Sequence, residues 1–149
     1  MIKNIIILST VLTFFGCTSK EENFLKEHKV ILCCSSRSFP NQTLTKEAIE
    51  FEKKQNINFN EASKIYLNFL NDKGEKNDSI LSKIILPSMI IDNYYIYSFK
   101  NIKTLKIATF GVWVNTNTGE VTNDHCKIWL YEDDIVKYYK NDENPKTKN

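Results

Sequence analysis

The sequence predicts an α+β domain in which two or three N-terminal helices pack on an antiparallel sheet of about four strands. Apolar side chains recur at helical spacing between residues 43 and 70. From residue 89 onward the chain becomes rich in Ile, Tyr and Val, which fit a pleated surface, and it contains a Thr-Gly turn signal. Helices that come before the strands, rather than alternating with them, are typical of this class.

Each helix has its own pattern. Between Thr43 and Gln55 the apolar residues fall on one helical face. A second helix is predicted over residues 61–70, capped by Asn60-Glu61, with an apolar stripe at helical spacing formed by Ala62, Ile65, Tyr66, Phe69 and Leu70. A third helical stretch is predicted from Asp78 to the residues before Pro87, because a residue before proline avoids helical geometry.

The strands are predicted from shorter patterns. Residues 30–34 form an apolar run of strand length, and residues 89–99 read as one strand that is covered on both faces. Residues 105–115 form the next strand, and the turn at 116–119 leads into a return strand that begins at residue 120. Residues 126–131 alternate as a further strand. Asp133-Asp134 fits either the cap of a last helix or a hairpin turn leading into 135–139, of which we expect the hairpin.

The N-terminus predicts a signal peptide followed by lipid attachment. Lys3 precedes the apolar run 5–15, which is too short for a membrane span of about 20 residues, and Gly16 precedes Cys17. These residues resemble the processing box of bacterial lipoproteins, although Phe14 and Phe15 stand where that family usually has Leu and a small residue. The resemblance implies that residues 1–16 are removed and that Cys17 receives acyl chains, palmitate among them. A buried N-terminal strand and an uncleaved membrane anchor are the alternatives.

The residues after Cys17 predict an address and a domain plan. Thr18 to Glu22 resembles the signal that sends lipoproteins of the Bacteroidota to the outer face of the outer membrane; an ordinary solvated tether is the alternative. We expect a polar tether over 17–29, a single domain over 30–140 and a disordered tail over 141–149. The first partner expected is the membrane, reached through the acyl chains, and the location is the bacterial envelope.

Composition argues against nucleic acid as a partner. Arg37 is the single arginine in a chain with 20 basic and 18 acidic residues and a formal charge of +2. Arginine is the preferred side chain for bidentate phosphate and base contacts, so we expect no nucleic-acid binding. No phosphate-binding glycine loop is present, and no cofactor is expected.

Three cysteines remain after Cys17. An oxidising compartment favours a disulfide, and we expect Cys126 to pair with Cys33 or Cys34, with Cys34–Cys126 as the leading pair. Three buried free thiols are the main alternative. A metal site is not expected, because the cysteines and histidines have no CxxC or HxxxH spacing.

Catalysis is not expected. His125 and Cys126 contain the groups of a thiol dyad, but neighbours on a strand point to opposite faces. The aromatic residues Tyr95, Tyr97 and Trp113 fit two alternatives: a role in the core, which we expect, or a groove that binds a protein or peptide partner.

The segment from residue 60 to residue 121 resembles a PepSY-type domain. The resemblance rests on the aromatic strand Tyr94–Phe99 and on the turn Asn115-Thr116-Asn117-Thr118-Gly119-Glu120-Val121, although many antiparallel hairpins use similar turns. It implies a module that binds or inhibits partners, often peptidases, and that has no catalytic residues. We therefore expect a lipid-anchored, non-enzymatic binding or inhibitory module. An immunity lipoprotein that neutralises a toxin and a small envelope enzyme are the alternatives.

Overall fold

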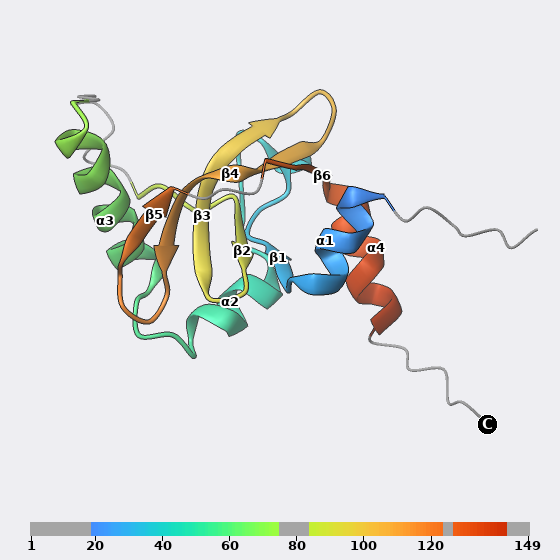
Figure 1. Cartoon of the computed structure of the whole chain (residues 1–149), viewed down its shortest axis with the longest axis horizontal. Coiled ribbons are helices and arrows are strands. Elements are labelled where there is room, and N and C mark those ends of the chain that lie inside the picture. Colours follow the sequence, from blue (N-terminus) through green and yellow to red (C-terminus); the bar gives the residue numbers. More distant parts are fainter. Residues whose placement is uncertain (1–18, 75–83, 124–126, 143–149) are drawn as a thin grey trace, which may run out of the picture.

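The computed structural model describes residues 19–74, 84–123 and 127–142, and for residues 139–142 it describes the backbone alone. Within these ranges the chain forms an α+β domain with an antiparallel sheet, as predicted (Figure 1). The helices are α1 Lys20–Glu27, the 3₁₀-helix η1 Ser36–Ser38, α2 Lys46–Glu52, α3 Phe59–Asp72 and α4 Glu132–Asp142. The strands are β1 Val30–Leu32, β2 Met89–Ile91, β3 Tyr94–Asn101, β4 Lys106–Asn115, β5 Val121–Asn123 and β6 Trp129–Tyr131. None of the helices in the described ranges is long and apolar enough to cross a membrane.

Strand β4 organises the sheet. The strand order is β1-β2-β3-β4-β5, and β6 also pairs with β4. Along one edge β4 pairs with β3, and along its other edge it pairs first with β6 and then with β5. Between these last two pairings the buried Thr109 donates its backbone N–H to the carbonyl of Ile128 at 2.8 Å. One strand therefore holds three neighbours, and the sheet has six strands where about four were expected.

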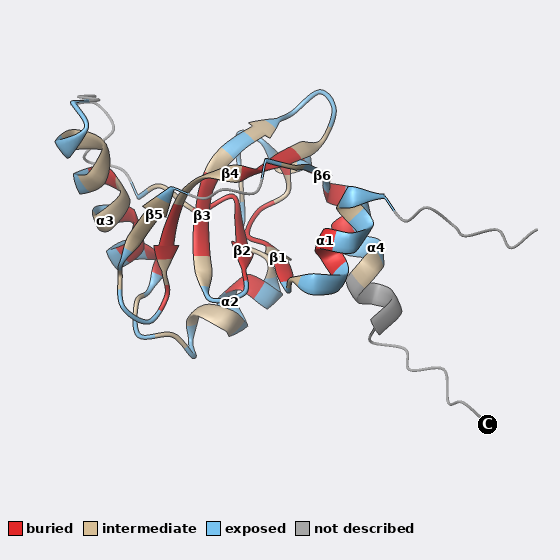
Figure 2. Cartoon of the chain, in the orientation of Figure 1, coloured by how far each residue is buried: buried red, intermediate tan, exposed pale blue. Residues whose placement is uncertain are grey.

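Each face of the sheet has its own core. On one face Phe24 and Leu25 of α1 and Ile135 of α4 pack with strand residues that include Ile107 and Leu130. On the opposite face α2 and α3 contribute to a second core, which consists of Cys33, Cys34, Ala48, Phe59, Ala62, Ile90, Tyr95, Tyr97 and Val114. Figure 2 shows buried residues along the middle of the sheet and on α1. The sheet thus lies between the helix pair α1/α4 and the helix pair α2/α3.

Helix α1 corrects the expectation of a polar tether over 17–29. Ser19 caps this helix by accepting a hydrogen bond from the N–H of Glu22 at 3.1 Å. Phe24 and Leu25 are each 4% exposed, because they enter the core formed with α4. Two apolar residues in a charged segment were too few to reveal an amphipathic helix by periodicity, yet they bury enough apolar surface to hold it on the sheet. The folded domain therefore begins at α1.

The strand predicted over 89–99 is two strands. Asp92 adopts a φ of 50°, and Asp92 and Asn93 form the turn between β2 and β3. The turn reverses the chain, so Ile90 lies opposite Tyr95 in the register and on the same face. A single strand over 89–99 would place Ile90 and Tyr95 on opposite faces, so that prediction is wrong. Asp and Asn are among the few residues that tolerate positive φ, and this was the missed signal.

Helix α3 begins earlier than predicted. The cap is Asn58, not Asn60: Asn58 accepts from the N–H of Glu61 at 2.9 Å, and the Glu61 carboxylate accepts from the N–H of Asn58 at 2.9 Å. This reciprocal pair is a capping box. The fully buried residues of α3 are Phe59, Ala62, Ser63 and Leu67. Ala62 was part of the predicted stripe, and Ile65 and Tyr66 of that stripe are half-buried against the same core.

The hairpin preferred for residues 132–140 is a helix, α4. Three acids, Glu132, Asp133 and Asp134, occupy its first turn, where carboxylates interact favourably with the helix dipole. Ile135 and Tyr138, spaced three residues apart, contact the core shared with α1. Helix α4 also reaches Asp142, beyond the predicted start of the tail. Of the third helical stretch, residues 75–83 lie outside the described ranges and residues 84–87 are not helical.

Strands β3 and β4 lie close together at Gly111. The register shifts between Ser98 and Lys100, and Gly111 lies opposite Ser98 with a φ of 148°. A Cβ at Gly111 would lie 2.3 Å from the backbone oxygen of Tyr97. Gly111 therefore permits both the bulge and the backbone conformation, which a residue with a side chain adopts only under strain.

We predict that Gly111→Ala lowers the free energy of unfolding by at least about 2 kcal/mol, because it combines an unfavourable backbone conformation with a clash against backbone. Gly74→Ala is the matched control, because Gly74 also has a positive φ, 80°, but its Cβ would meet nothing within 4 Å. The control should cost about 1 kcal/mol. Urea denaturation of both variants measures the difference, and equal losses would contradict the role assigned to Gly111.

Candidate functional site

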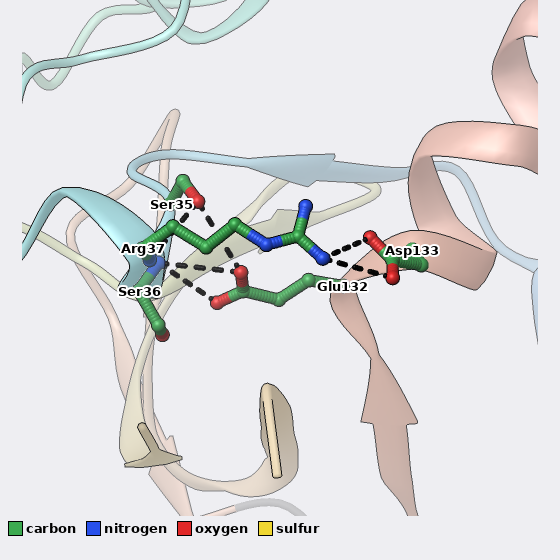
Figure 3. A network of polar contacts seen from close by, with 5 residues as sticks. All are labelled: Ser35, Ser36, Arg37, Glu132 and Asp133. Carbon is green, nitrogen blue, oxygen red and sulfur yellow. Dashed lines mark hydrogen bonds and ion pairs between the residues drawn. The ribbon is translucent and has the colours of Figure 1, made fainter. Parts of the chain in front are cut away.

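The carboxylate of Glu132 is buried and accepts several hydrogen bonds from the loop after β1. Its two oxygens accept hydrogen bonds from the backbone N–H of Ser36 at 3.0 and 3.2 Å, and the Ser35 hydroxyl lies 3.4 Å from Oε2 (Figure 3). Glu132 is 2% exposed and Ser36 1% exposed. Beside it, Arg37 donates to both oxygens of Asp133 at 2.8 and 2.9 Å, in an exposed ion pair. The loop after β1 is thereby joined to the start of α4.

Lys100 interacts electrostatically with Glu132. Its ammonium donates to the carbonyl oxygen of Cys34 at 2.8 Å. Burial lowers the pKa of Lys100, and the neighbouring Cys34 and Glu132 oppose that effect. A buried carboxylate with donors from backbone and a cation nearby is a stable structural arrangement. The hydrogen bonds of Glu132 to Ser35 and Ser36 therefore join the start of α4 to the loop after β1, and we call them the Glu132 clamp.

The two described cysteines are poor nucleophiles in this setting. Cys33 and Cys34 are free and fully buried. Burial raises the pKa of the Cys33 thiol, and the adjacent Cys34 raises it further. Burial also raises the pKa of the Cys34 thiol, against the opposing effect of Lys100. Since the thiolate is the reactive form, both groups are held in their unreactive state. Cys126 lies outside the described ranges, so the Cys34–Cys126 disulfide stays a prediction.

The histidine considered as a ligand has a structural contact. His28 Nδ1 lies 2.8 Å from Asp92 Oδ2, and Asp92 Oδ1 accepts from the N–H of Lys29 at 2.9 Å. The β2–β3 turn is thus fixed to the end of α1. In the parts of the chain that the structure describes, no three His, Cys, Asp or Glu side chains gather as a metal site would require. Asp124, His125 and Cys17, the residue predicted to receive the lipid, lie outside those parts.

The three aromatic residues predicted as partner-binding candidates are buried and do not form one surface. Tyr95, Tyr97 and Trp113 are 0%, 5% and 9% exposed. Tyr95 and Tyr97 belong to the core under α2 and α3, and Trp113 belongs to the core under α1 and α4. Tyr95 donates its hydroxyl to the carbonyl of Ile57 at 2.8 Å, and Trp113 donates its ring N–H to the carbonyl of Thr109 at 3.0 Å. Their burial and these internal bonds favour the core alternative.

A hollow of about 160 Å³ opens beside Tyr97. Its wall includes a parallel ring pair, Tyr66 and Tyr97, with centroids 4.2 Å apart and planes 6° apart. Phe99 forms an exposed part of the lining, with 74% of its surface accessible. The remaining lining residues are uncharged as well: Ile85, Leu86, Ser88, Ser98 and Gly111. The hollow therefore suits an apolar or aromatic group rather than an ion.

Sequence reasoning missed this hollow because it assumed a regular strand over 89–99. The assumed alternation placed Phe99 on the same covered face as Tyr97. In the structure the register shifts after Ser98, and the side chain of Phe99 is exposed to solvent instead of covered. Gly111 was the available signal, because a glycine within a strand often marks a bulge.

A comparison of the chain with models of protein families, with curated proteins and with solved structures finds no match in any of the three. The resemblances to bacterial lipoproteins and to PepSY-type domains therefore stay predictions.

We predict that Glu132→Ala lowers the free energy of unfolding by about 2–3 kcal/mol, because it leaves the buried N–H of Ser36 without its acceptor. Asp133→Ala removes the adjacent exposed carboxylate and its ion pair with Arg37, and it should cost less than about 1 kcal/mol. Thermal and urea unfolding of the two variants measure the contrast. A loss at Asp133 as large as that at Glu132 would contradict the clamp.

Proposed function

We propose that the protein is a lipid-anchored lipoprotein of the bacterial envelope whose α+β domain is a non-enzymatic binding module. The anchor is proposed from the sequence, where Lys3, the apolar run 5–15, Gly16 and Cys17 follow the order of a lipoprotein processing box. Two or more acyl chains on Cys17 hold a protein stably on a bilayer, whereas a single chain does so only marginally.

The observation that supports a binding role is the uncharged hollow lined by Tyr66, Tyr97 and Phe99. Pockets for whole small molecules usually measure about 300–1,000 Å³, so a hollow of about 160 Å³ is too small for a typical cofactor or substrate. It is of a size to receive part of a partner, such as one apolar side chain. Protein interfaces often depend on such an anchor in a well-packed pocket. A protein or peptide is therefore the proposed partner.

The chemistry of the described thiols supports a non-catalytic role. A nucleophilic cysteine needs a lowered pKa and access to a substrate. Cys33 and Cys34 have raised pKa values and are fully buried. Lys100, a candidate base because its pKa is lowered, uses its ammonium to donate to the carbonyl of Cys34. These groups are positioned for stability.

We predict that the membrane-bound protein has the mass of residues 17–149 plus acyl chains, because the signal peptidase removes residues 1–16 after Cys17 is lipidated. Mass spectrometry of the protein extracted from its own membranes measures this. Cys17→Ser should abolish both the added mass and the cleavage, while Cys33→Ser, the matched control, should change neither. An unmodified species of 149 residues would contradict the anchor.

We predict that Phe99→Ala weakens partner binding by about tenfold, which corresponds to about 1.4 kcal/mol, because it removes the exposed wall of the hollow. The unfolding free energy should change by less than about 0.5 kcal/mol, since the side chain is mostly exposed. The partner is first recovered with the unaltered domain from envelope extracts and identified. Its affinity for each variant is then measured by calorimetry.

Phe39→Ala is the matched control, because Phe39 is 60% exposed and does not line the hollow. Equal affinity of the Phe39 and Phe99 variants for the recovered partner would contradict the hollow as the binding site. The identity of the partner distinguishes the roles within this class: a peptidase indicates an inhibitor, and a toxin indicates an immunity protein.

A further inference from the structure

The hollow opens on the face of the sheet that carries α2 and α3, and this face continues beyond the hollow toward the β3–β4 hairpin. Tyr97, which lines the hollow, packs in the core with α2 and α3. Phe99, the next residue of β3 with the same parity, lines the hollow too and is mostly exposed. Figure 1 shows the hairpin and β6 on the side of the sheet away from α3. The exposed wall of the hollow therefore borders an open part of this face.

Strand β6 adds aromatic side chains to the same face. Ile107 and Leu130 lie opposite each other in the register and belong to the core with α1 and α4. Because side chains alternate along a strand, Trp129 and Tyr131 point to the other face, which is the face of the hollow. Trp129 contacts Phe110 of β4 edge to face, with ring centroids 5.4 Å apart. Trp129 and Tyr131 are 38% and 44% exposed. We call Phe99, Phe110, Trp129 and Tyr131 the aromatic platform.

Two lysines lie on the same face as the aromatic platform. The Lys106 ammonium is 4.4 Å from the centroid of the Tyr131 ring, within the range of a cation–π contact. Lys127 is exposed and precedes Trp129 by two residues. Ile128, between them, packs against the core with α1 and α4, so Lys127 points to the platform side.

The acids that adjoin the platform in sequence do not neutralise these lysines. No acid occurs in residues 94–119 or 127–131. At the start of α4, Glu132 is buried in its clamp and Asp133 is ion-paired. Asp134 is exposed, but α4 packs on the opposite face of the sheet, as does α1 with its acids.

The acids of α2 and α3 also lie elsewhere. Helix α2 packs by β1, at the far edge of the sheet from β6. The start of α3 lies by the β4–β5 turn, because the N–H of Ile57 donates to the carbonyl of Thr116 at 2.9 Å. At the end of α3, Lys73 follows Tyr66 by about two helical turns and shares its side of the helix, whereas Asp72 does not. Among the described residues, the platform therefore has a positive charge.

We propose that the hollow and the aromatic platform together bind an extended segment of a partner protein, in which an acidic residue lies about two to four positions from an apolar one. The inference deepens the proposed function and rests on it, because the apolar side chain is the one that enters the hollow. The carboxylate meets Lys106 or Lys127, and the rings of the platform pack against the segment between the two contacts.

The spacing follows from the register. Lys106 lies opposite Asn101, which is two residues along β3 from Phe99. One strand across and two residues along correspond to about 8 Å between the Cα atoms of Phe99 and Lys106. An extended peptide spans this distance in about two or three residues. The length of the lysine side chain allows a further position.

Selection from random peptides displayed on phage tests the sequence preference. The target is the full protein, purified from its membranes in detergent and immobilised. We expect the selected peptides to combine an apolar residue with Asp or Glu about two to four positions away. Apolar peptides without such an acid would overturn the inference and leave the hollow as a binding site. Failure to select any peptide with an apolar residue in common would contradict the proposed function as well.

Charge variants test the contact itself with a selected peptide and its amide form, in which Asn or Gln replaces the acids. Replacing Lys106 and Lys127 by Gln should weaken binding of the acidic peptide about fivefold at low salt and leave binding of the amide form unchanged. The control replaces Lys20 and Lys137, exposed lysines of the helices on the opposite face, and should change neither affinity. Fluorescence anisotropy of the labelled peptides measures all four affinities. Equal losses in the two variants would overturn the assignment of this surface.

An acidic polysaccharide offers carboxylates and apolar sugar faces to the same lysines and rings, and polygalacturonate is the probe for it. We expect polygalacturonate not to displace the selected peptide. Displacement that is lost when Lys106 and Lys127 are replaced would assign the platform to acidic sugars and overturn the inference, while the anchor and the fold would stand.

Discussion

The pairing of β4 with three other strands is the constraint on which the rest of the domain depends. One edge of β4 is occupied by β3, and the other is divided between β6 and β5. The division occurs at Thr109, whose hydroxyl accepts from the N–H of Ile128 at 3.1 Å. Gly111 allows the pairing of β4 with β3 on the other edge, because without a side chain it lets the two backbones approach at the bulge. Both ends of the sheet are thereby fixed by a few residues near the middle of one strand.

The hollow proposed as the binding site and the seat of α1 both follow from this arrangement. The register shift at the bulge brings Phe99 to solvent beside the hollow. Placement of β6 along β4 directs the chain into α4, which the Glu132 clamp joins to the loop after β1. Helix α4 and the sheet then form the core that receives α1. Helix α1 is thereby held on the same face of the sheet as α4.

The class of the fold and most strands could be predicted from the sequence, because the spacing of apolar residues and the composition of each segment indicate its local structure. The apolar run at Val30 and the turn near Gly119 were placed well for this reason. What could not be predicted depended on contacts between distant segments. Phe24 and Leu25 are too few to indicate a helix until the core that receives them is known. Similarly, Tyr97 and Phe99 would lie on the same face of a regular strand. Because of the bulge between them, Tyr97 is buried and Phe99 is exposed.

The central claim is that the folded domain begins at α1, three residues after Cys17, the proposed lipid-attachment residue, and that α1 is part of its core. Hydrogen–deuterium exchange of the mature protein on vesicles tests this claim most directly. If it is correct, the amides of Phe24 to His28 exchange nearly as slowly as those of β3 and β4, because they are hydrogen-bonded in a helix that packs on the core. Exchange of these amides at the rate of an unstructured peptide would show a flexible tether and would contradict the claim.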